Sequence, residues 1–336
     1  MKKNELILSV RDLNIKFNLR GKILHAIRGI DLDVYHGEVL AIVGESGSGK
    51  SVFTKSFMGL LDSNGSITSG TIDYFGADDH QPIRLSELKK EKDWLKVRGH
   101  EIAMIMQDPM TSLNPLKTIG DQIMEAVELH QGLKGAAARE KTLEYLRDVG
   151  IADPEVRFKQ YPHEFSGGMR QRVVIAIAVA CNPQILICDE PTTALDVTIQ
   201  AQILDLLRNL KNKINSSIML ITHDLGVIAE MADYVVVMYA GRVVEKGTAE
   251  EIFANPAHPY TIGLMASKPV VGKKVDKLYS IPGKVPNPIN MPDYCYFKDR
   301  CEMQVEKCCG EYPHMIQLSP THMVSCYRYF DGKVGE

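Results

Sequence analysis

The sequence predicts an α/β fold in which a parallel sheet is interrupted by a helical segment and followed by a cysteine-bearing extension. Residues 44–51 fit the phosphate-binding loop pattern G-x-x-x-x-G-K-[ST], with a buried strand expected before it at 39–43 and a helix after it at 51–58. From 118 to 180 the apolar residues recur at three- and four-residue spacings, which predicts helices. Further apolar runs with the length of buried strands lie at 101–106, 184–190 and 217–222.

Size and composition place the chain among ordinary globular proteins. Its 336 residues are 45% apolar and 24% charged, enough to bury a large core. A net charge of −3 without a dense basic run argues against sequence-independent nucleic-acid binding. We expect the chain neither to cross a bilayer nor to be secreted, because no apolar stretch has membrane-spanning length and residues 1–12 lack the apolar region of a signal peptide.

The residues of the phosphate-binding loop have a physical reason to bind an anion. Its glycines let successive N–H groups turn inward, the following helix adds the positive end of its dipole, and Lys50 supplies a full charge. Ser51 is the expected Mg²⁺ ligand. The loop residues expected to bind phosphate are Gly44, Glu45, Ser46, Gly47, Ser48, Gly49, Lys50 and Ser51.

The segments on either side of the loop predict an accessory sheet and connecting material. Residues 6–34 alternate apolar and polar positions, which suits antiparallel strands with one wet face. Phe17 in this region is a candidate platform for adenine stacking, although a strand aromatic of the core is an equally good interpretation. Beyond a short strand ending near Tyr74, the charged segment 85–98 is expected to be helical.

Polar residues follow three of the predicted buried strands. Gln107 can reach a γ-phosphate, Mg²⁺ or water, although a strand-end polar residue usually faces solvent. Asp189 is expected to hold Mg²⁺ and Glu190 to polarise the attacking water. His223 is a candidate partner of the γ-phosphate, although a lone histidine is more often a surface or core residue.

Two further helix starts and a hairpin complete the core. Ser166 is expected to cap a helix, and Gly167 and Gly168 leave its first N–H groups approachable, which makes a second anion-ready helix start. An amphipathic helix is expected at 197–211, and a hairpin at 234–245 precedes a capping box at 248–251. The core is expected to end near residue 255.

The tail, which we define as residues 256–336, begins with a proline-rich stretch and carries five of the seven cysteines. Such clustering suggests a metal site, because disulfides are uncommon in a chain with no sign of secretion. The spacing lacks the tight C-x-x-C of common zinc and ferredoxin sites, so it does not name a metal, and buried thiols under a loop-rich tail are the alternative. The five residues are Cys295, Cys301, Cys308, Cys309 and Cys326.

The order and spacing of these motifs over residues 6–255 resemble the nucleotide-binding subunit of an ATP-binding cassette (ABC) transporter. The resemblance implies a RecA-like core with an antiparallel subdomain (1–108 and 181–255), a helical subdomain (109–180) and a C-terminal extension (256–336). It makes Gln107 a further Mg²⁺ ligand beside Ser51 and Asp189, and gives Glu190, His223 and Gln107 catalytic roles.

The same resemblance implies a head-to-tail pair of ATPase subunits. Ser166, Gly167, Gly168 and Met169 of one subunit would cap the ATP held by the other, and Asp196 would couple the two sites. The chain departs from the common family pattern at Met169, where glutamine is usual.

Within the ABC family, the chain resembles the importers of oligopeptides and dipeptides. The similar segments are 107–115, 161–172 and 258–261, although nickel and glutathione importers share several of them. This branch implies a second ATP-binding subunit in a heterodimer, two transmembrane permeases, an extracytoplasmic peptide-binding protein, and a place at the cytoplasmic face of the membrane. The region just after Gln107 would contact the permeases. The branch also selects Cys295, Cys301, Cys308 and Cys326 as ligands of a [4Fe–4S] cluster, with zinc as the less favoured alternative.

Two other functions remain as hypotheses. A soluble ABC protein acting on DNA or ribosomes usually carries two cassettes or a long coiled-coil insert, and this chain has neither. A regulator that holds ATP without turnover is disfavoured by the presence of both Glu190 and His223.

Overall fold

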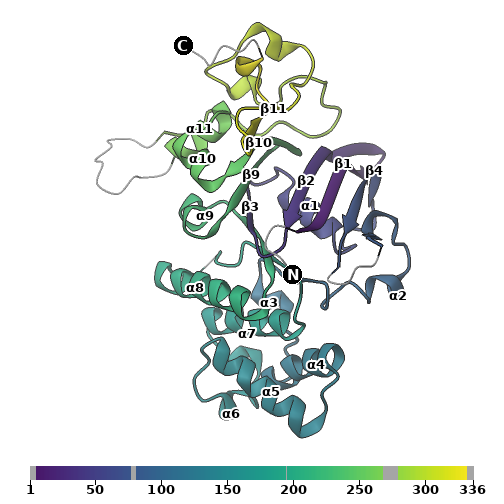
Figure 1. The fold of residues 1–336 in the computed structure, drawn as a ribbon, viewed down its shortest axis with the longest axis vertical. Coiled ribbons are helices and arrows are strands. Elements are labelled where there is room, and N and C mark those ends of the chain that lie inside the picture. The colour runs from purple at the N-terminus through teal and green to yellow at the C-terminus, as the bar shows by residue number, and fades with distance from the viewer. Residues whose placement is uncertain (1–4, 77–80, 194, 268–278, 331–336) are drawn as a thin grey trace.

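The computed structural model describes residues 5–76, 81–193, 195–267 and 279–330. Parts of the sequence predictions at the N-terminus, at residue 194 and in the proline-rich stretch at 268–278 lie outside the described residues. Figure 1 shows an elongated molecule with a helical region at its lower end, two sheets in the middle and the tail at its upper end.

The main sheet, within the described residues, has eight strands in the order β11-β12-β10-β9-β3-β8-β7-β6. The strands from β9 to β6 pair in parallel, whereas β10, β12 and β11 add antiparallel pairs at the other edge. Every residue of β3, β7 and β8 is buried, as expected for parallel strands covered on both faces. The predicted apolar strands are confirmed. The bounds are β3 Val39–Val43, β6 Ile102–Ile105, β7 Ile185–Asp189, β8 Ser217–Thr222, β9 Tyr234–Tyr239, β10 Arg242–Thr248, β11 Ile316–Gln317 and β12 Met323–Val324.

A second, antiparallel sheet has the order β2-β1-β4-β5 among the described residues. The two long strands β1 (Leu6–Leu19) and β2 (Lys22–Tyr35) pair along their length, which confirms the alternation read from the sequence. With β4 (Gly65–Tyr74) and β5 (Ile83–Arg84) they bury one apolar face against α1 (Lys50–Ser56) and the main sheet.

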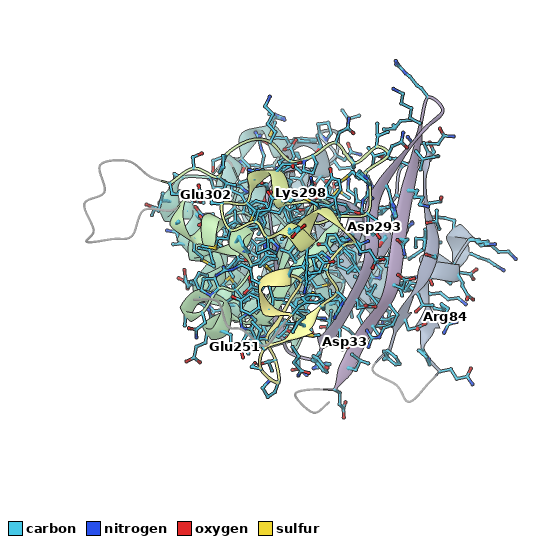
Figure 2. The ribbon with its side chains drawn as sticks, turned by 90° about the horizontal axis from the view of Figure 1, so that it is seen from above. Asp33, Arg84, Glu251, Asp293, Lys298 and Glu302 are labelled. Carbon is cyan, nitrogen blue, oxygen red and sulfur yellow. The ribbon has the colours of Figure 1, made fainter. Side chains whose placement is uncertain are left out.

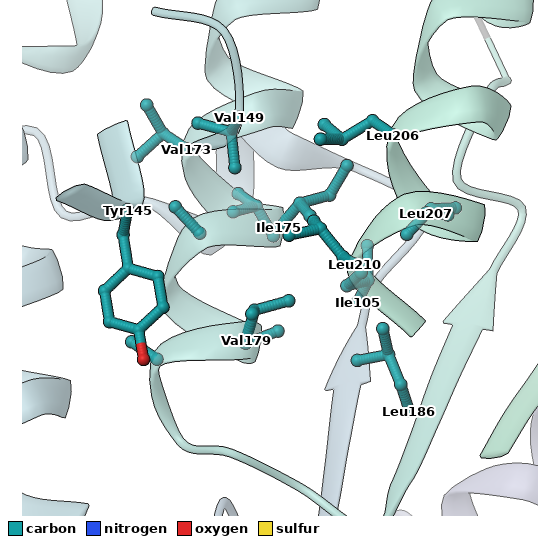
Figure 3. Packing of buried hydrophobic residues seen from close by; sticks show 14 of the residues in the cluster. Ile105, Tyr145, Val149, Val173, Ile175, Val179, Leu186, Leu206, Leu207 and Leu210 are labelled. Atoms are coloured by element: carbon teal, nitrogen blue, oxygen red, sulfur yellow. The ribbon is translucent and has the colours of Figure 1, made fainter. Parts of the chain in front are cut away.

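The helical region contains α3 (Pro109–Ser112), α4 (Ile119–Gln131), α5 (Gly135–Asp148), α6 (Pro154–Arg157) and α7 (Gly167–Ala180). Helix α7 joins this region to the main sheet. Figure 3 shows its side chains Val173, Ile175 and Val179 between α5 on one side and α8 (Val197–Ile214) with β6 and β7 on the other. Because α7 is buried on all sides, its apolar residues continue around the helix rather than along one stripe.

The charged segment 85–98 is not the helix that the sequence predicts. It forms a 3₁₀ turn at Leu85–Glu87 and one short helix, α2 (Glu91–Trp94). Leu85 and Trp94 are buried but none of the residues between them is, so no continuous apolar face stabilises a longer helix.

The tail is less irregular than predicted. It contains α11 (Pro259–Ala266), 3₁₀ turns at Lys298–Arg300, Glu306–Cys309 and Tyr327–Tyr329, and the strands β11 and β12, of which β12 pairs with β10. Its Tyr260 and Phe297 rings lie 4.7 and 5.3 Å from the ring of Tyr239 in β9. Figure 2 looks down on the tail, whose labelled Lys298 and Glu302 lie over the core. The tail therefore packs on the core rather than hanging from it.

The remaining helices, α9 (Leu225–Met231) and α10 (Ala249–Ala254), cover the edge of the main sheet near the tail. The capping box predicted at the start of α10 is present, formed by Thr248 and Glu251. Within the described part of the chain, no helix combines the length and the apolar character that a membrane crossing requires.

The buried His258 makes stability depend on pH. Its Nδ1 accepts a hydrogen bond from the Tyr260 N–H and caps α11, and burial lowers its pKa to about 4. The unfolded chain binds this proton below about pH 6.5 and the folded chain only below about pH 4. We therefore expect unfolding midpoints in urea to fall as pH drops through this window. His258→Asn keeps a capping acceptor without a titrating group, and its midpoint should fall less steeply; an unchanged slope would contradict the assignment.

Candidate nucleotide site

A cavity of about 590 Å³ opens where β3 and β7 end, a size usual for ligand sites. One part of it is polar, formed by the phosphate loop together with Gln107 and Glu190. The other part is mostly apolar and is formed by Leu24, Ala26, Val52 and Ala240 with residues 285–288 of the tail. The loop residues that line it are Ser46, Gly47, Gly49, Lys50 and Ser51.

The loop turns sharply from β3 into α1. Gly49 caps the helix with φ 99°, and an added Cβ would lie 2.9 Å from Ile27 Cδ1, so both conformation and space call for glycine. The Lys50 ammonium donates to the carbonyls of Gly44 at 2.7 Å and Glu45 at 3.1 Å. Burial lowers the pKa of Lys50, while the carboxylates of Glu190, Asp189 and Glu45 oppose that effect. The loop thus holds a buried cation at the entrance to a helix.

Ser51 and Asp189 meet across the cavity floor. The Ser51 hydroxyl donates to Asp189 Oδ1 at 3.2 Å, although the two residues follow different strands. Burial raises the pKa of Asp189, and the hydrogen bond from Ser51 opposes that shift. A hydroxyl and a carboxylate side by side are hard oxygen donors of the kind that Mg²⁺ prefers, so this pair fits a Mg²⁺ site.

Glu190 is held by residues from three strand ends. Its Oε2 accepts from Gln107 Nε2 at 3.0 Å and from Thr193 Oγ1 at 2.9 Å, and its Oε1 lies 3.4 Å from His223 Nδ1. Its backbone φ is 48°, a strained value for a non-glycine residue, and is fixed by the N–H bond to the Ile221 carbonyl. The sequence did not indicate Thr193. The structure thus brings Gln107 and His223 to the carboxylate of Glu190.

The residues of the predicted partner contact lie elsewhere. Ser166 caps α7 by accepting from the Met169 N–H, and Ser166 and Gly167 are exposed. Asp196 caps the neighbouring α8, and a Cβ on Gly168 would lie 2.8 Å from Ile199 Cγ2 on that helix. None of the residues from 166 to 169 is among the described residues lining the cavity. Their contact with a second subunit stays a prediction.

Phe17 is largely buried close to the cavity. Its side chain is 9% exposed and belongs to the core beneath the antiparallel sheet, where its ring lies over Gly65. Phe17 is not itself a lining residue, but it pairs across the sheet with Leu24, which is one. Its role as an adenine platform stays a prediction.

Comparison with known proteins identifies the family. A family model described as "ABC transporter" matches residues 27–193, and one described as "Oligopeptide/dipeptide transporter, C-terminal region" matches residues 244–308. The oligopeptide transport ATP-binding protein AmiE of Streptococcus pneumoniae is 55% identical over 286 residues, which are 85% of this chain and 79% of AmiE. The chain belongs to the ATP-binding proteins of oligopeptide and dipeptide ABC transporters. The resemblance drawn from the motif order is confirmed.

Other relatives agree with this ABC family assignment. AppD of Bacillus subtilis is 48% identical over 96% of this chain and 97% of AppD. DppD of Lactococcus lactis is 50% identical over 96% of this chain and 91% of DppD. The dimeric structure of the ATP-binding cassette MJ0796 bound to ADP and Pi has a TM-score of 0.63 at 25% identity, covering 72% of this chain and 98% of that cassette. The predicted ABC fold is thereby confirmed. The chain is an ATPase, with ATP and Mg²⁺ as its ligands.

A contact that the family motifs did not indicate joins the tail to the phosphate loop of this ABC ATPase. Arg300 makes two bonds to the Glu45 carboxylate, at 2.6 and 3.0 Å, and also donates to the Pro282 carbonyl and the Tyr239 hydroxyl. The Glu45 N–H donates to the Tyr260 hydroxyl at 2.7 Å. Such a forked pair with a side chain that is 5% exposed fixes the loop against the tail.

The tail cysteines of this ABC subunit are thiols in one neighbourhood. Burial raises the pKa of Cys295 to about 12 and of Cys326 to about 11, and Cys301 and Cys308 raise both further. Cys309 is exposed, with Gln304 as its neighbour. Across the described ranges, no three His, Cys, Asp or Glu side chains are grouped so that they could hold a metal ion. The described residues therefore show no metal site at these cysteines, and both the cluster and the zinc alternative stay predictions.

Removing the Arg300 fork should destabilise the protein. Arg300→Ala leaves the Glu45 carboxylate unpaired, at an expected cost of about 2–3 kcal/mol in the free energy of unfolding. Arg84→Ala removes a pair with Asp73 that is 48% exposed on the arginine side, and should lower the free energy of unfolding far less because solvent screens this pair. Urea unfolding measures the free energy of unfolding of both variants. Equal losses would show that the Arg300–Glu45 pair contributes no more to stability than an exposed ion pair does.

Proposed function

We propose that this chain is the ATP-hydrolysing subunit of an importer of peptides, working at the cytoplasmic face of the cell membrane. The relatives AmiE, AppD and DppD are oligopeptide or dipeptide transport ATP-binding proteins, which supports the choice of solute. The observation that carries the proposal is the Glu190 carboxylate, held beside His223 and Gln107 at the polar end of a cavity that also contains Lys50.

In this proposal the side chains divide the work. The loop N–H groups and Lys50 bind the β- and γ-phosphates, and Ser51, Asp189 and Gln107 hold Mg²⁺. When bound, Mg²⁺ neutralises charge that develops on the phosphate oxygens. Glu190 accepts a proton from the attacking water; its bonds from Gln107 and Thr193 both go to Oε2, so the 3.4 Å contact with His223 is the one at Oε1. His223 donates to the γ-phosphate.

The proposed catalytic unit is a pair of subunits, one of them a second ATP-binding chain. The exposed helix start at Ser166, Gly167, Gly168 and Met169 supplies N–H donors and a positive dipole end to the triphosphate on the partner. ATP binding then favours the closed pair and hydrolysis reopens it, because the γ-phosphate contacts exist only before hydrolysis. Asp196, at the start of α8 beside that helix, couples the two sites.

The proposed permease contact lies just after Gln107. Met110 on α3 is 61% exposed, and Leu116 in the following turn is 85% exposed. Exposed apolar side chains of this kind suit the docking of an apolar partner helix. The full assembly would contain two permeases and an extracytoplasmic peptide-binding protein.

We also propose that Cys295, Cys301, Cys308 and Cys326 hold a [4Fe–4S] cluster. Burial and the neighbouring thiols, Cys308 among them, raise the pKa of Cys295, Cys301 and Cys326, so the four thiols lie close to one another. Four cysteine thiolates are the ligand set that such a cluster requires. The cluster would fasten the tail covalently.

Glu190→Gln should lower the ATPase rate by at least about a hundredfold, because an amide cannot accept the proton. The variant should still bind ATP and accumulate the closed pair, which size-exclusion chromatography of the protein with its partner subunit detects. Glu230→Gln, an exposed surface change, is the control and should keep the parental rate. Parental hydrolysis by Glu190→Gln would remove Glu190 as the base.

Leu116→Asp should leave the ATPase rate of the isolated subunits unchanged and abolish peptide uptake by cells, because a carboxylate cannot be buried against the permease. The matched control is Val156→Asp, at another exposed apolar position, on α6. Uptake that survives Leu116→Asp would argue against docking at this surface.

Protein purified without oxygen should contain about four irons and four acid-labile sulfides per chain and absorb visible light. Cys326→Ser should lose most of the iron, whereas Cys309→Ser should keep it. Stoichiometric zinc, absence of metal, or equal losses from the two variants would each count against the cluster.

A further inference from the structure

The apolar end of the nucleotide cavity is partly built by the tail. Residues 285–288 line it together with Leu24, Ala26, Val52 and the phosphate loop, and they lie alongside β2, where Leu24 bridges to Ile289. These positions lie outside the ABC transporter match at 27–193 and within the C-terminal-region match at 244–308. A segment far along the chain therefore forms a wall of the ATP site.

Several contacts fix this wall to β2. Arg28, which is 5% exposed, donates to the Pro288 carbonyl at 2.8 Å and to the Tyr296 hydroxyl at 3.3 Å. The His25 N–H donates to the same carbonyl at 3.4 Å, and Leu24 forms an isolated antiparallel bridge with Ile289. In Figure 2 the labelled Asp293 of the tail lies beside the strands of the antiparallel sheet. The wall is thus held in place before any ligand arrives.

The chemistry of the lining suggests what this wall contacts. A triphosphate placed on the loop directs its nucleoside toward the apolar end, where apolar walls suit a purine ring. Phe17 pairs with Leu24 across the antiparallel sheet, and Leu24 lines the cavity, so the largely buried Phe17 ring belongs to the same part of the molecule. The tail adds Pro286 and Pro288 to the apolar surface that a purine ring can contact there.

We propose that residues 285–288 form the nucleoside wall of the ATP site and that Asn287 determines part of its specificity. The Asn287 Oδ1 accepts from the Ile289 N–H at 3.1 Å, which fixes a turn. Its NH₂ group finds no acceptor among the described residues, so it is available to a ring nitrogen of adenine or a ribose oxygen. This inference rests on the proposed ATP site and adds a part of it.

Asn287→Asp tests the wall with little disturbance of the fold. A carboxylate keeps the acceptor for the Ile289 N–H and replaces the donor by a negative charge. ADP should then bind about tenfold more weakly, while inorganic pyrophosphate, which lacks a nucleoside, should change by less than about twofold. Asn290→Asp adds the same charge three residues away, outside the cavity lining, and should change neither.

Three other results of these ADP and pyrophosphate binding measurements would each contradict the proposal. Equal ADP affinity in the parent and Asn287→Asp would show that Asn287 does not meet the nucleoside. Equal losses for ADP and pyrophosphate would place the effect at the phosphates instead. A parent chain that binds neither ligand would overturn the ATP site itself, and the nucleoside wall with it.

Photolabelling of the parent chain with 8-azido-ADP tests directly whether residues 285–288 contact the nucleoside. The label should appear in the tryptic peptide 285–298 and disappear when excess ADP competes. ADP-sensitive label confined to other peptides, such as 23–28, would overturn the wall while leaving the ATP site intact.

Discussion

The parallel pairing of β3, β8, β7 and β6 is the constraint on which the site depends. In this register Val43 lies opposite Thr222, Asp189 opposite Ile221 and Ile105 opposite Cys188, so the strands end at one edge of the sheet. The residues that follow are then brought together although the chain separates them widely. The Ser51–Asp189 hydrogen bond and the contacts of Glu190 follow from this pairing and not from any local sequence. Two buried apolar clusters on either face of the sheet hold the register.

The parts of the fold that could be predicted are those indicated by a pattern within a short stretch of sequence. Buried strands show as apolar runs, and the phosphate loop carries its own chemistry in eight residues. Phe17 could not be placed, because its burial depends on Gly65 of the neighbouring strand leaving room for the ring. The Arg300–Glu45 pair and the tail wall involve residues more than two hundred positions apart, and neither has a periodic signal. Tertiary packing likewise limited the helix predicted at 85–98.

The tail and the phosphate loop behave as one structural unit. Arg300 stands next to Cys301 in the chain and bonds to Glu45 in the loop, while Tyr260 accepts from the loop backbone. An arginine stays charged over the whole physiological range, and its pairing with Glu45 further raises its pKa. The arginine side of the contact between the cysteine region and the loop therefore keeps its charge across the physiological pH range. An ABC subunit built this way holds its nucleotide between a conventional core and a wall that its own C-terminal segment supplies.

A crystal structure of the full chain with Mg²⁺ and a non-hydrolysable ATP analogue tests the central claim most directly. The account predicts phosphates within hydrogen-bond reach of Lys50 Nζ and the loop N–H groups, Mg²⁺ beside Ser51 and Asp189, and Glu190 facing the γ-phosphate. A triphosphate bound away from the loop, or Glu190 and Asp189 turned away from the metal and the γ-phosphate, would contradict it.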